Sequence, residues 1–211
     1  MNFCSTLSET PKIDRALILM LALADLLARG GERVGMPGLV SPRIGRDVPE
    51  RFADALVRTN MQTEWPQTGQ ISRFSDVMVI SDFLAPAEEI TGRIRSLAGS
   101  GAKATLLQIF DPAEETFPYE GRLEFADPES GDTWLAERAG SLRQGYGSRL
   151  AAHRNAISNA SRHAGFNFGV HHTDRPATDG LLFLYASLSE TTPGQNYQHQ
   201  VTPASNTVMA S

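Results

Sequence analysis

Two aspartates that follow apolar segments are the strongest candidates for chemistry in this sequence. The segment VMVISDFL, residues 77–84, carries four apolar residues that lead into Ser81 and Asp82. The segment KATLLQIF, residues 103–110, is followed at once by Asp111 and Pro112. Both segments predict buried strands. Ligands of open parallel sheets bind beyond the carboxyl ends of the strands, so Asp82 and Asp111 are predicted to share one rim. There they would offer oxygen ligands to Mg²⁺, Mn²⁺ or Ca²⁺.

Each aspartate also has a purely structural interpretation. A carboxylate at a strand-to-helix turn often accepts hydrogen bonds from the backbone of the loop that follows, which would account for Asp82. The pair Asp111-Pro112 is also a common way to begin a turn. The residues alone leave both interpretations open at each position.

Strands and helices alternate along most of the chain, and this order predicts the fold class. Strands are predicted at residues 33–40, 75–84, 103–110 and 166–173, and a hairpin at 122–135. Helices are predicted at residues 10–30, 48–59, 86–99, 141–164 and 177–188. The pattern indicates an α/β fold with three layers, in which a mostly parallel sheet has helices on both faces. Pro37 conflicts with the first strand, because proline cannot donate to a sheet ladder.

The domain prediction is simple. Residues 1–188 are predicted to form one domain, and the polar segment 189–211, which lacks periodicity, is predicted to be a disordered tail. The apolar segment 16–28 is too short to cross a bilayer and contains Asp25, so it predicts a buried helix rather than a membrane span.

Charge and cysteine content narrow the class of protein. The net charge of −5 and the absence of a run rich in lysine and arginine argue against nucleic-acid binding. The single cysteine, Cys4, excludes an internal disulfide and makes the cytoplasm the expected compartment.

An ordered set of segments resembles a known family. The set comprises VMVISDFL, QIFDPAEETFPYEGRLEFADPESGD, YGSRLAAHRNAI and HHTDRP, in this order and spacing. It resembles the bacterial domain-of-unknown-function 58 family over about residues 1–188. The resemblance implies a von Willebrand factor A-like fold, related to Rossmann-like sheets. It also implies a metal-ion-dependent adhesion site made of an Asp-x-Ser-x-Ser motif, a threonine, and an aspartate that ends the fourth strand.

The resemblance assigns these ligands only in part. Asp82 matches the aspartate after the fourth strand and would support Mg²⁺ or Mn²⁺, mostly through water. Ser41 lies in about the region of the threonine and is a weak substitute for it. The segment Met1-Asn2-Phe3 resembles the residues that follow the Asp-x-Ser-x-Ser motif. The first strand is therefore expected to be missing, through either an upstream start or a degenerate copy. A sheet without that strand would leave an open edge that invites pairing with another chain.

The resemblance implies a binding protein rather than an enzyme. Family members often accompany MoxR-type AAA+ ATPases, so the expected role is that of an adaptor or co-chaperone with a partial adhesion site. The alternative function is a metal-dependent hydrolase that uses the carboxylates of Asp82, Asp111 and Glu114. Such an enzyme also needs an activated nucleophile and oxyanion donors, and neither can be identified from the sequence.

Overall fold

The computed structural model describes residues 5, 7, 8, 10–59, 65, 67–119, 123–126, 133–136, 139–189 and 196–198. The helices are α1 (Lys12–Arg29), α2 (Val48–Arg58), α3 (Ala87–Gly99), α4 (Pro112–Thr116), α5 (Ala139–His163) and α6 (Ala177–Ser189), with a 3-10 turn η1 (Thr68–Gln70). The strands are β1 (Val34–Met36), β2 (Val40–Arg43), β3 (Asp76–Ser81), β4 (Lys103–Phe110), β5 (Leu123–Ala126), β6 (Thr133–Ala136), β7 (Asn167–His172) and β8 (Asn196–Gln198). The segment Met1-Asn2-Phe3 and Cys4 lie outside the described residues.

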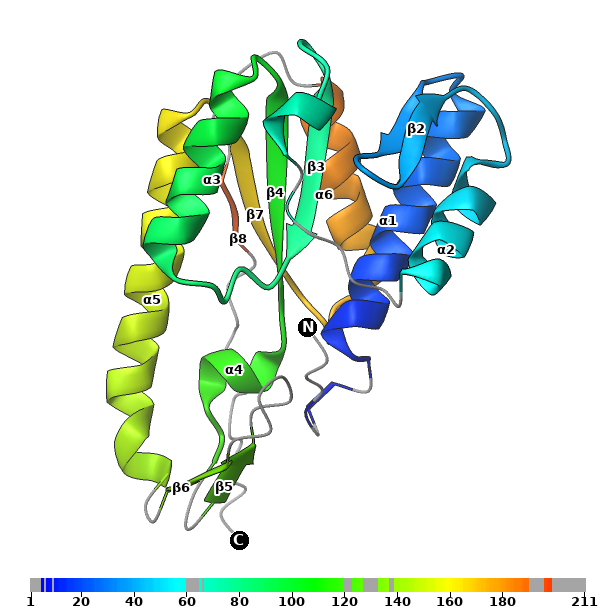
Figure 1. Ribbon diagram of the computed structural model, residues 1–211. Helices are drawn as coiled ribbons and strands as arrows, with labels where there is room; N and C mark the ends of the chain where they lie inside the picture. Colours follow the sequence, from blue (N-terminus) through cyan, green and yellow to red (C-terminus); the bar gives the residue numbers. More distant parts are fainter. Residues whose placement is uncertain are drawn as a thin grey trace, which may run out of the picture.

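The main sheet places the two candidate aspartates at the same edge. Strands β3, β4, β7 and β8 lie side by side in that order, and each neighbouring pair is parallel (Figure 1). The register sets Ser81 beside Gln108 and Phe110 beside His172, so three strands end close together. We call this edge the rim, and define it by the residues that follow β3, β4 and β7. Asp82 and Asp111 therefore both lie on the rim, as predicted.

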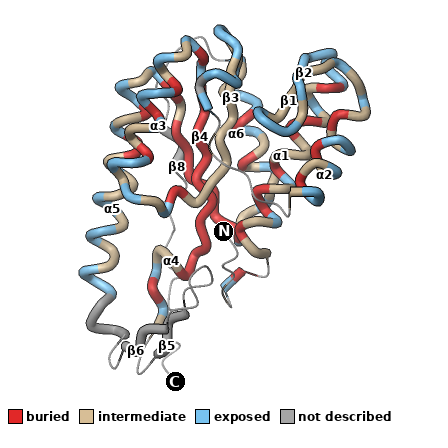
Figure 2. The backbone as a smooth tube through the Cα atoms, viewed as in Figure 1, coloured by how far each residue is buried: buried red, intermediate tan, exposed pale blue. Residues whose placement is uncertain are grey.

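Helices cover both faces of this sheet because β4 is apolar on both sides. Leu106 and Phe110 pack with side chains of α3 and α5, in a core that includes Ile157. Leu107 and Ile109 point the other way, into a core with side chains of α1 and α6. Figure 2 shows β4 buried along nearly its whole length. The predicted α/β fold, with a parallel sheet between helices, is confirmed. In the part of the chain that the structure describes, no helix has both the length and the apolar character needed to cross a membrane.

The strand predicted at residues 33–40 is present only as β1, Val34–Met36, because the rest of that segment turns into a hairpin. Strand β1 pairs with β2 in an antiparallel two-stranded sheet, and Met36 lies opposite Val40. Pro37 and Gly38 form the turn, and Gly38 has a φ of 77° that favours glycine. Pro37, which conflicts with a strand interior, therefore lies in the turn that ends β1. The hairpin predicted at residues 122–135 is confirmed as β5 and β6.

Two further elements differ from the predictions. The segment after Asp111 continues into the short helix α4 instead of a simple turn. Within the predicted disordered tail, residues 196–198 form β8, which pairs in parallel with β7. The other residues after Ser189 lie outside the described part of the chain.

Candidate functional site

A buried lysine lies between two carboxylates of the rim. The Nζ atom of Lys12 is 2.8 Å from Oε1 of Glu114 and 3.4 Å from Oδ2 of Asp82. The side chain of Lys12 is 1% exposed, and those of Asp82 and Glu114 are 13% and 11% exposed. A buried ammonium ion is stable only with such partners. Lys12 therefore neutralises part of the negative charge that Asp82 and Glu114 bring to the rim.

The backbone around Asp82 is fixed by its neighbours. The Nε2 atom of Gln108, which is fully buried, donates to the carbonyl oxygen of Asp82 at 2.9 Å. The N–H of Phe83 donates to Oγ of Ser81 at 3.1 Å, and Phe83 adopts a positive φ of 50°. The hydroxyl of Ser81 thus takes the local capping role that one interpretation assigned to Asp82. The carboxylate of Asp82 faces Lys12 instead.

Asp111 caps helix α4. One carboxylate oxygen accepts from the N–H of Ala113 at 2.8 Å and from Oγ of Ser5 at 2.5 Å, and the other accepts from the N–H of Ser5 at 3.0 Å. Glu114 completes a capping box, because its Oε2 accepts from the N–H of Asp111 at 3.0 Å. Asp111 is fully buried, so the geometry favours its structural interpretation over a ligand role.

A second charged cluster lies beside the first, and sequence reasoning missed it. Glu115 accepts from Arg154 at 2.7 Å through Oε1, and its Oε2 is 2.6 Å from Nε2 of His172. The hydrogen bond to His172, and to a smaller extent the one to Arg154, lowers the pKa of Glu115 from 4.5 to about 2. The guanidinium of Arg154 also lies 4.8 Å from the centre of the Phe110 ring. Glu115 and Arg154 are 39 residues apart, and no local spacing indicates that they meet.

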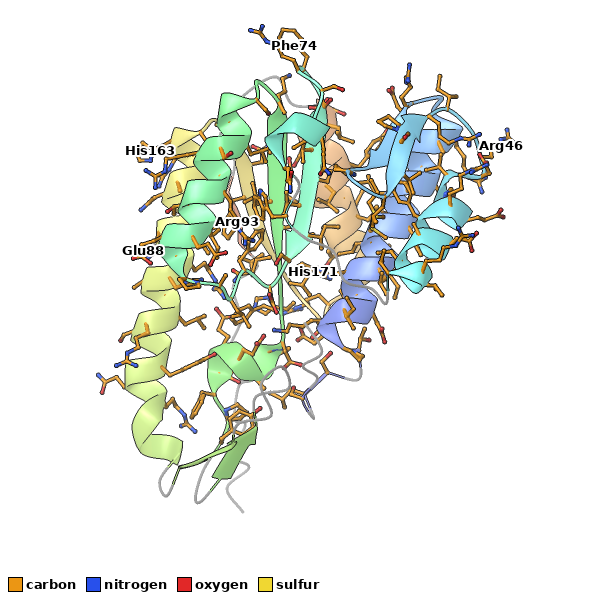
Figure 3. All side chains as sticks on the ribbon, in the orientation of Figure 1. Arg46, Phe74, Glu88, Arg93, His163 and His171 are labelled. Carbon is orange, nitrogen blue, oxygen red and sulfur yellow. The ribbon has the colours of Figure 1, made fainter. Side chains whose placement is uncertain are left out.

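The two histidines that end β7 point to opposite faces, as residues in a strand do. His172 faces Phe110 with ring centres 6.3 Å apart. His171 lies on the other face, where a Cβ at Gly180 of α6 would be 3.2 Å from the imidazole (Figure 3). Two neighbouring side chains on opposite faces of a strand cannot hold one ion together.

Ser41 does not reach the rim. It is an exposed residue of β2, and Figure 1 shows β2 at the end of the molecule opposite α4. The structure therefore does not bring Ser41 together with Asp82.

The residues at the rim do not fit a divalent cation as they are arranged. Mg²⁺ requires oxygen ligands at about 2.0–2.1 Å in an octahedron, whereas the ammonium of Lys12 lies between Asp82 and Glu114. Among the described residues, no group of three or more His, Cys, Asp or Glu side chains is placed to hold a metal ion. Ligation of Mg²⁺ or Mn²⁺ by Asp82, and the hydrolase alternative that depends on it, are expectations from the sequence that this arrangement of side chains does not support.

Comparisons with solved structures give weak likenesses. BatB, a conserved hypothetical protein from Bacteroides thetaiotaomicron, is 12% identical with a TM-score of 0.49, over 89% of this chain and 92% of that one. An aerotolerance-related membrane protein from Bacteroides fragilis, solved with multiple mutations to serine, is 12% identical with a TM-score of 0.44, over 88% of this chain and 93% of that one. No curated protein matches the sequence. A family model described as "Protein of unknown function DUF58" matches residues 1–156. This match covers more than half of the sequence, and the chain therefore belongs to the DUF58 family.

Proposed function

We propose that this protein is a cytoplasmic interaction module that binds a partner protein at the rim. The observation that carries the proposal is the fixed charge cluster where the strands end. Five carboxylates (Asp82, Asp111, Glu114, Glu115 and Asp174) meet four cations (Lys12, Arg15, Arg154 and Arg175), which leaves a formal charge of −1 with neutral histidine. Charges that are held in place by neighbours favour selective protein recognition. The fitting partner surface presents arginine or lysine.

The finer fold assignment is part of the same proposal. We infer a von Willebrand A-like arrangement, because Asp82 directly follows a parallel strand, as the resemblance requires of the aspartate after the fourth strand. In such a domain a metal ion usually bridges the partner. Here Lys12 supplies the positive charge next to Asp82, so we propose direct contact between the partner and the rim.

The proposed partner is a MoxR-type AAA+ ATPase, for which the chain would be an adaptor or co-chaperone. This part of the proposal rests on the sequence resemblance, and the acidic rim adds that the ATPase surface must be basic. Raising the ionic strength of the solution should then weaken binding, because partly exposed charges are screened by salt.

The test is the affinity of the purified chain for the MoxR-type ATPase from the same genome, measured by interferometry. Asp82→Asn removes the more exposed of the two carboxylates that pair with Lys12, while Lys12 keeps its contact with Glu114. We expect the variant to bind about tenfold more weakly than the parent chain.

The matched control is Asp25→Asn. Asp25 also pairs with a cation, Arg29, but on the exposed surface of α1. The control removes the same charge, so it should leave the affinity unchanged. Equal weakening by both variants, or no binding by the parent chain, would refute the proposal.

A further inference from the structure

The backbone takes an unusual conformation where β3 ends. Phe83 has a positive φ of 50°, a left-handed conformation that bulky residues rarely adopt. Such a conformation persists only where the surrounding structure holds it, and it is frequent at binding sites. Its neighbours in the chain belong to the rim, because Asp82 pairs with Lys12 and Leu84 is 54% exposed. The contacts that hold Phe83 therefore bear on how the rim presents Asp82.

Two peptide groups flank the Cα atom of Phe83, and their orientations define its backbone conformation. The first joins Asp82 to Phe83. Its carbonyl oxygen accepts from Nε2 of Gln108 at 2.9 Å, and its N–H donates to Oγ of Ser81 at 3.1 Å. Gln108 belongs to β4 and Ser81 to β3, so the sheet itself fixes the first peptide group.

The second peptide group, which follows Phe83, is held by a helix. Nε2 of His153, in α5, donates to the carbonyl oxygen of Phe83 at 2.7 Å. A carbonyl oxygen only accepts hydrogen bonds, so Nε2 of His153 must carry the hydrogen. The two residues are 70 positions apart in sequence. The hydrogen bond from His153 thus completes the set of contacts that keeps Phe83 left-handed.

Ring packing does not replace this hydrogen bond. The ring of Phe83 is buried, and its centre lies 6.2 Å from that of Trp65 and 6.4 Å from that of Phe168. Apolar contacts of this kind hold a side chain in place, but they are non-directional and do not orient a backbone carbonyl group. The next residue, Leu84, is mostly exposed and adds little packing. The orientation of the second peptide group therefore depends on His153.

The carboxylate of Asp82 depends on this backbone more than on its ion pair. Its Oδ2 lies 3.4 Å from Nζ of Lys12, whereas Oε1 of Glu114 lies at 2.8 Å. The longer distance exceeds the usual range of about 2.7–3.2 Å for an N–H···O bond, so Lys12 constrains Asp82 only weakly. If the second peptide group rotated, Phe83 would relax toward a negative φ and the carboxylate of Asp82 would move with it.

We propose that His153 is a positioning residue of the rim. By holding the carbonyl oxygen of Phe83, it keeps the carboxylate of Asp82 where a basic partner protein binds it. His153 does not itself touch the partner, because it acts through the backbone of Phe83. The inference rests on the function proposed for the rim, and it adds that a contact from α5 controls the affinity of that site.

The test compares three variants of the full chain. His153→Ala removes the donor, whereas His153→Gln keeps an N–H donor near the end of the side chain and should restore the contact. His163→Ala is the matched control, because His163 is an exposed residue of the same helix whose Nδ1 contacts the carbonyl oxygen of Asn159 (Figure 3). The measurements are the dissociation constant of the MoxR-type ATPase at low salt and the free energy of unfolding in urea.

We expect His153→Ala to bind the ATPase about fivefold more weakly than the parent chain, and His153→Gln to bind within about twofold of it. His163→Ala should bind as the parent chain does. Because His153 acts through Asp82, adding His153→Ala to Asp82→Asn should cause no further loss of affinity. A merely structural role of His153 would weaken binding by the double variant further.

A second measurement does not need the partner. In NMR spectra, the ¹³Cα shift of Phe83 reports its backbone conformation, and the ring ¹⁵N shifts of His153 report which nitrogen carries the hydrogen. We expect the left-handed shift of Phe83 in the parent chain and in His153→Gln, and its loss in His153→Ala. If His153→Ala does not fold, the ring shifts of the parent chain decide the question, since an Nε2 without hydrogen would overturn the inference.

Three further results would overturn the inference. The first is an unchanged affinity of His153→Ala when the parent chain binds the ATPase. The second is an additive loss in the double variant. The third is an unchanged shift of Phe83 in His153→Ala. Absence of binding by the parent chain refutes the rim proposal, and the shift of Phe83 then decides separately whether His153 holds this backbone.

Discussion

Lys12 is a cation at an unfavourable position in its own helix. It is the first residue of α1, where the positive end of the helix dipole disfavours a lysine. It is also almost completely buried. Both costs are offset by Asp82 and Glu114, which come from the ends of β3 and β4. At the scale of single residues, the rim therefore depends on mutual neutralisation rather than on any one side chain.

Replacing Lys12 should destabilise the protein strongly. In Lys12→Met the two carboxylates remain close together without their shared cation, and breaking a buried pair in this way costs about 3–5 kcal/mol. The measurement is the free energy of unfolding in urea. Arg29→Met is the control, because Arg29 and Asp25 are 66% and 40% exposed and such pairs contribute about 0–1 kcal/mol. Similar losses for the two variants would contradict the role given to Lys12.

The Glu115 pair should make stability depend on pH in a defined range. The pKa of Glu115 falls from 4.5 to about 2 on folding, so its contribution is complete above pH 4.5 and is lost as the pH falls toward 2. At neutral pH we expect Glu115→Gln to lower the free energy of unfolding by about 1–3 kcal/mol. This difference should shrink below pH 4.5.

Urea unfolding at a series of pH values measures this effect. Glu89→Gln is the control, because Glu89 pairs with Arg93 on the exposed surface of α3. A difference between Glu115→Gln and the parent chain that stays constant down to pH 2.5 would contradict the assignment.

At the scale of elements, the close packing of α6 on β7 requires a glycine. A Cβ atom at Gly169 would lie 2.6 Å from Cε1 and 2.7 Å from Cζ of Phe183. The absence of a side chain at this position of β7 lets the ring of Phe183 approach the sheet. The approach helps to hold α6 beside α1, and the loop between β7 and α6 contributes to the rim.

Gly169→Ala should therefore destabilise the fold through overpacking, by about 1–3 kcal/mol. Gly92→Ala is the opposite case, because nothing lies within 4 Å of a Cβ at Gly92, in the interior of α3. It should stabilise by about 0.5–1 kcal/mol through helix propensity. Thermal melting of both variants measures the difference. A Gly169→Ala variant as stable as the parent chain would show that the ring of Phe183 moves freely.

At the scale of the whole molecule, the rim collects residues from distant parts of the chain. Lys12 and Glu114 are 102 residues apart in sequence, and Glu115 and His172 are 57 apart. Strand β4 was predictable to the residue, since its apolar run lies between Gly101 and Asp111. The position of Asp82 at the rim was predictable in the same way, because Asp82 follows the apolar run of β3.

What the sequence did not reveal has physical reasons. Helix α4 has only five residues, too few to show a helical period. The β1–β2 hairpin differs from the predicted single strand because Pro37 and Gly38 form its turn. The pairing of Lys12 with Asp82 and Glu114 depends on how α1 packs against the sheet, and no local pattern encodes it.

The rim is expected not to bind Mg²⁺ or Mn²⁺ in the full chain, because the ammonium of Lys12 lies between the carboxylates that would hold the ion. Calorimetric titration of each ion into the chain and into Asp82→Ala tests this. We expect no saturable heat in either protein. Saturable binding that disappears in Asp82→Ala would show that the side chain of Lys12 moves away when the metal binds. That result would support the adhesion-site prediction instead.

The central claim is that the rim binds a partner protein through its fixed charges. Its most direct test is the ratio of the dissociation constants of the MoxR-type ATPase for Asp82→Asn and for the parent chain, measured at low salt. We predict a ratio of about ten that falls toward one at high salt. A ratio of one at low salt, with clear binding of the ATPase to the parent chain, would contradict the claim.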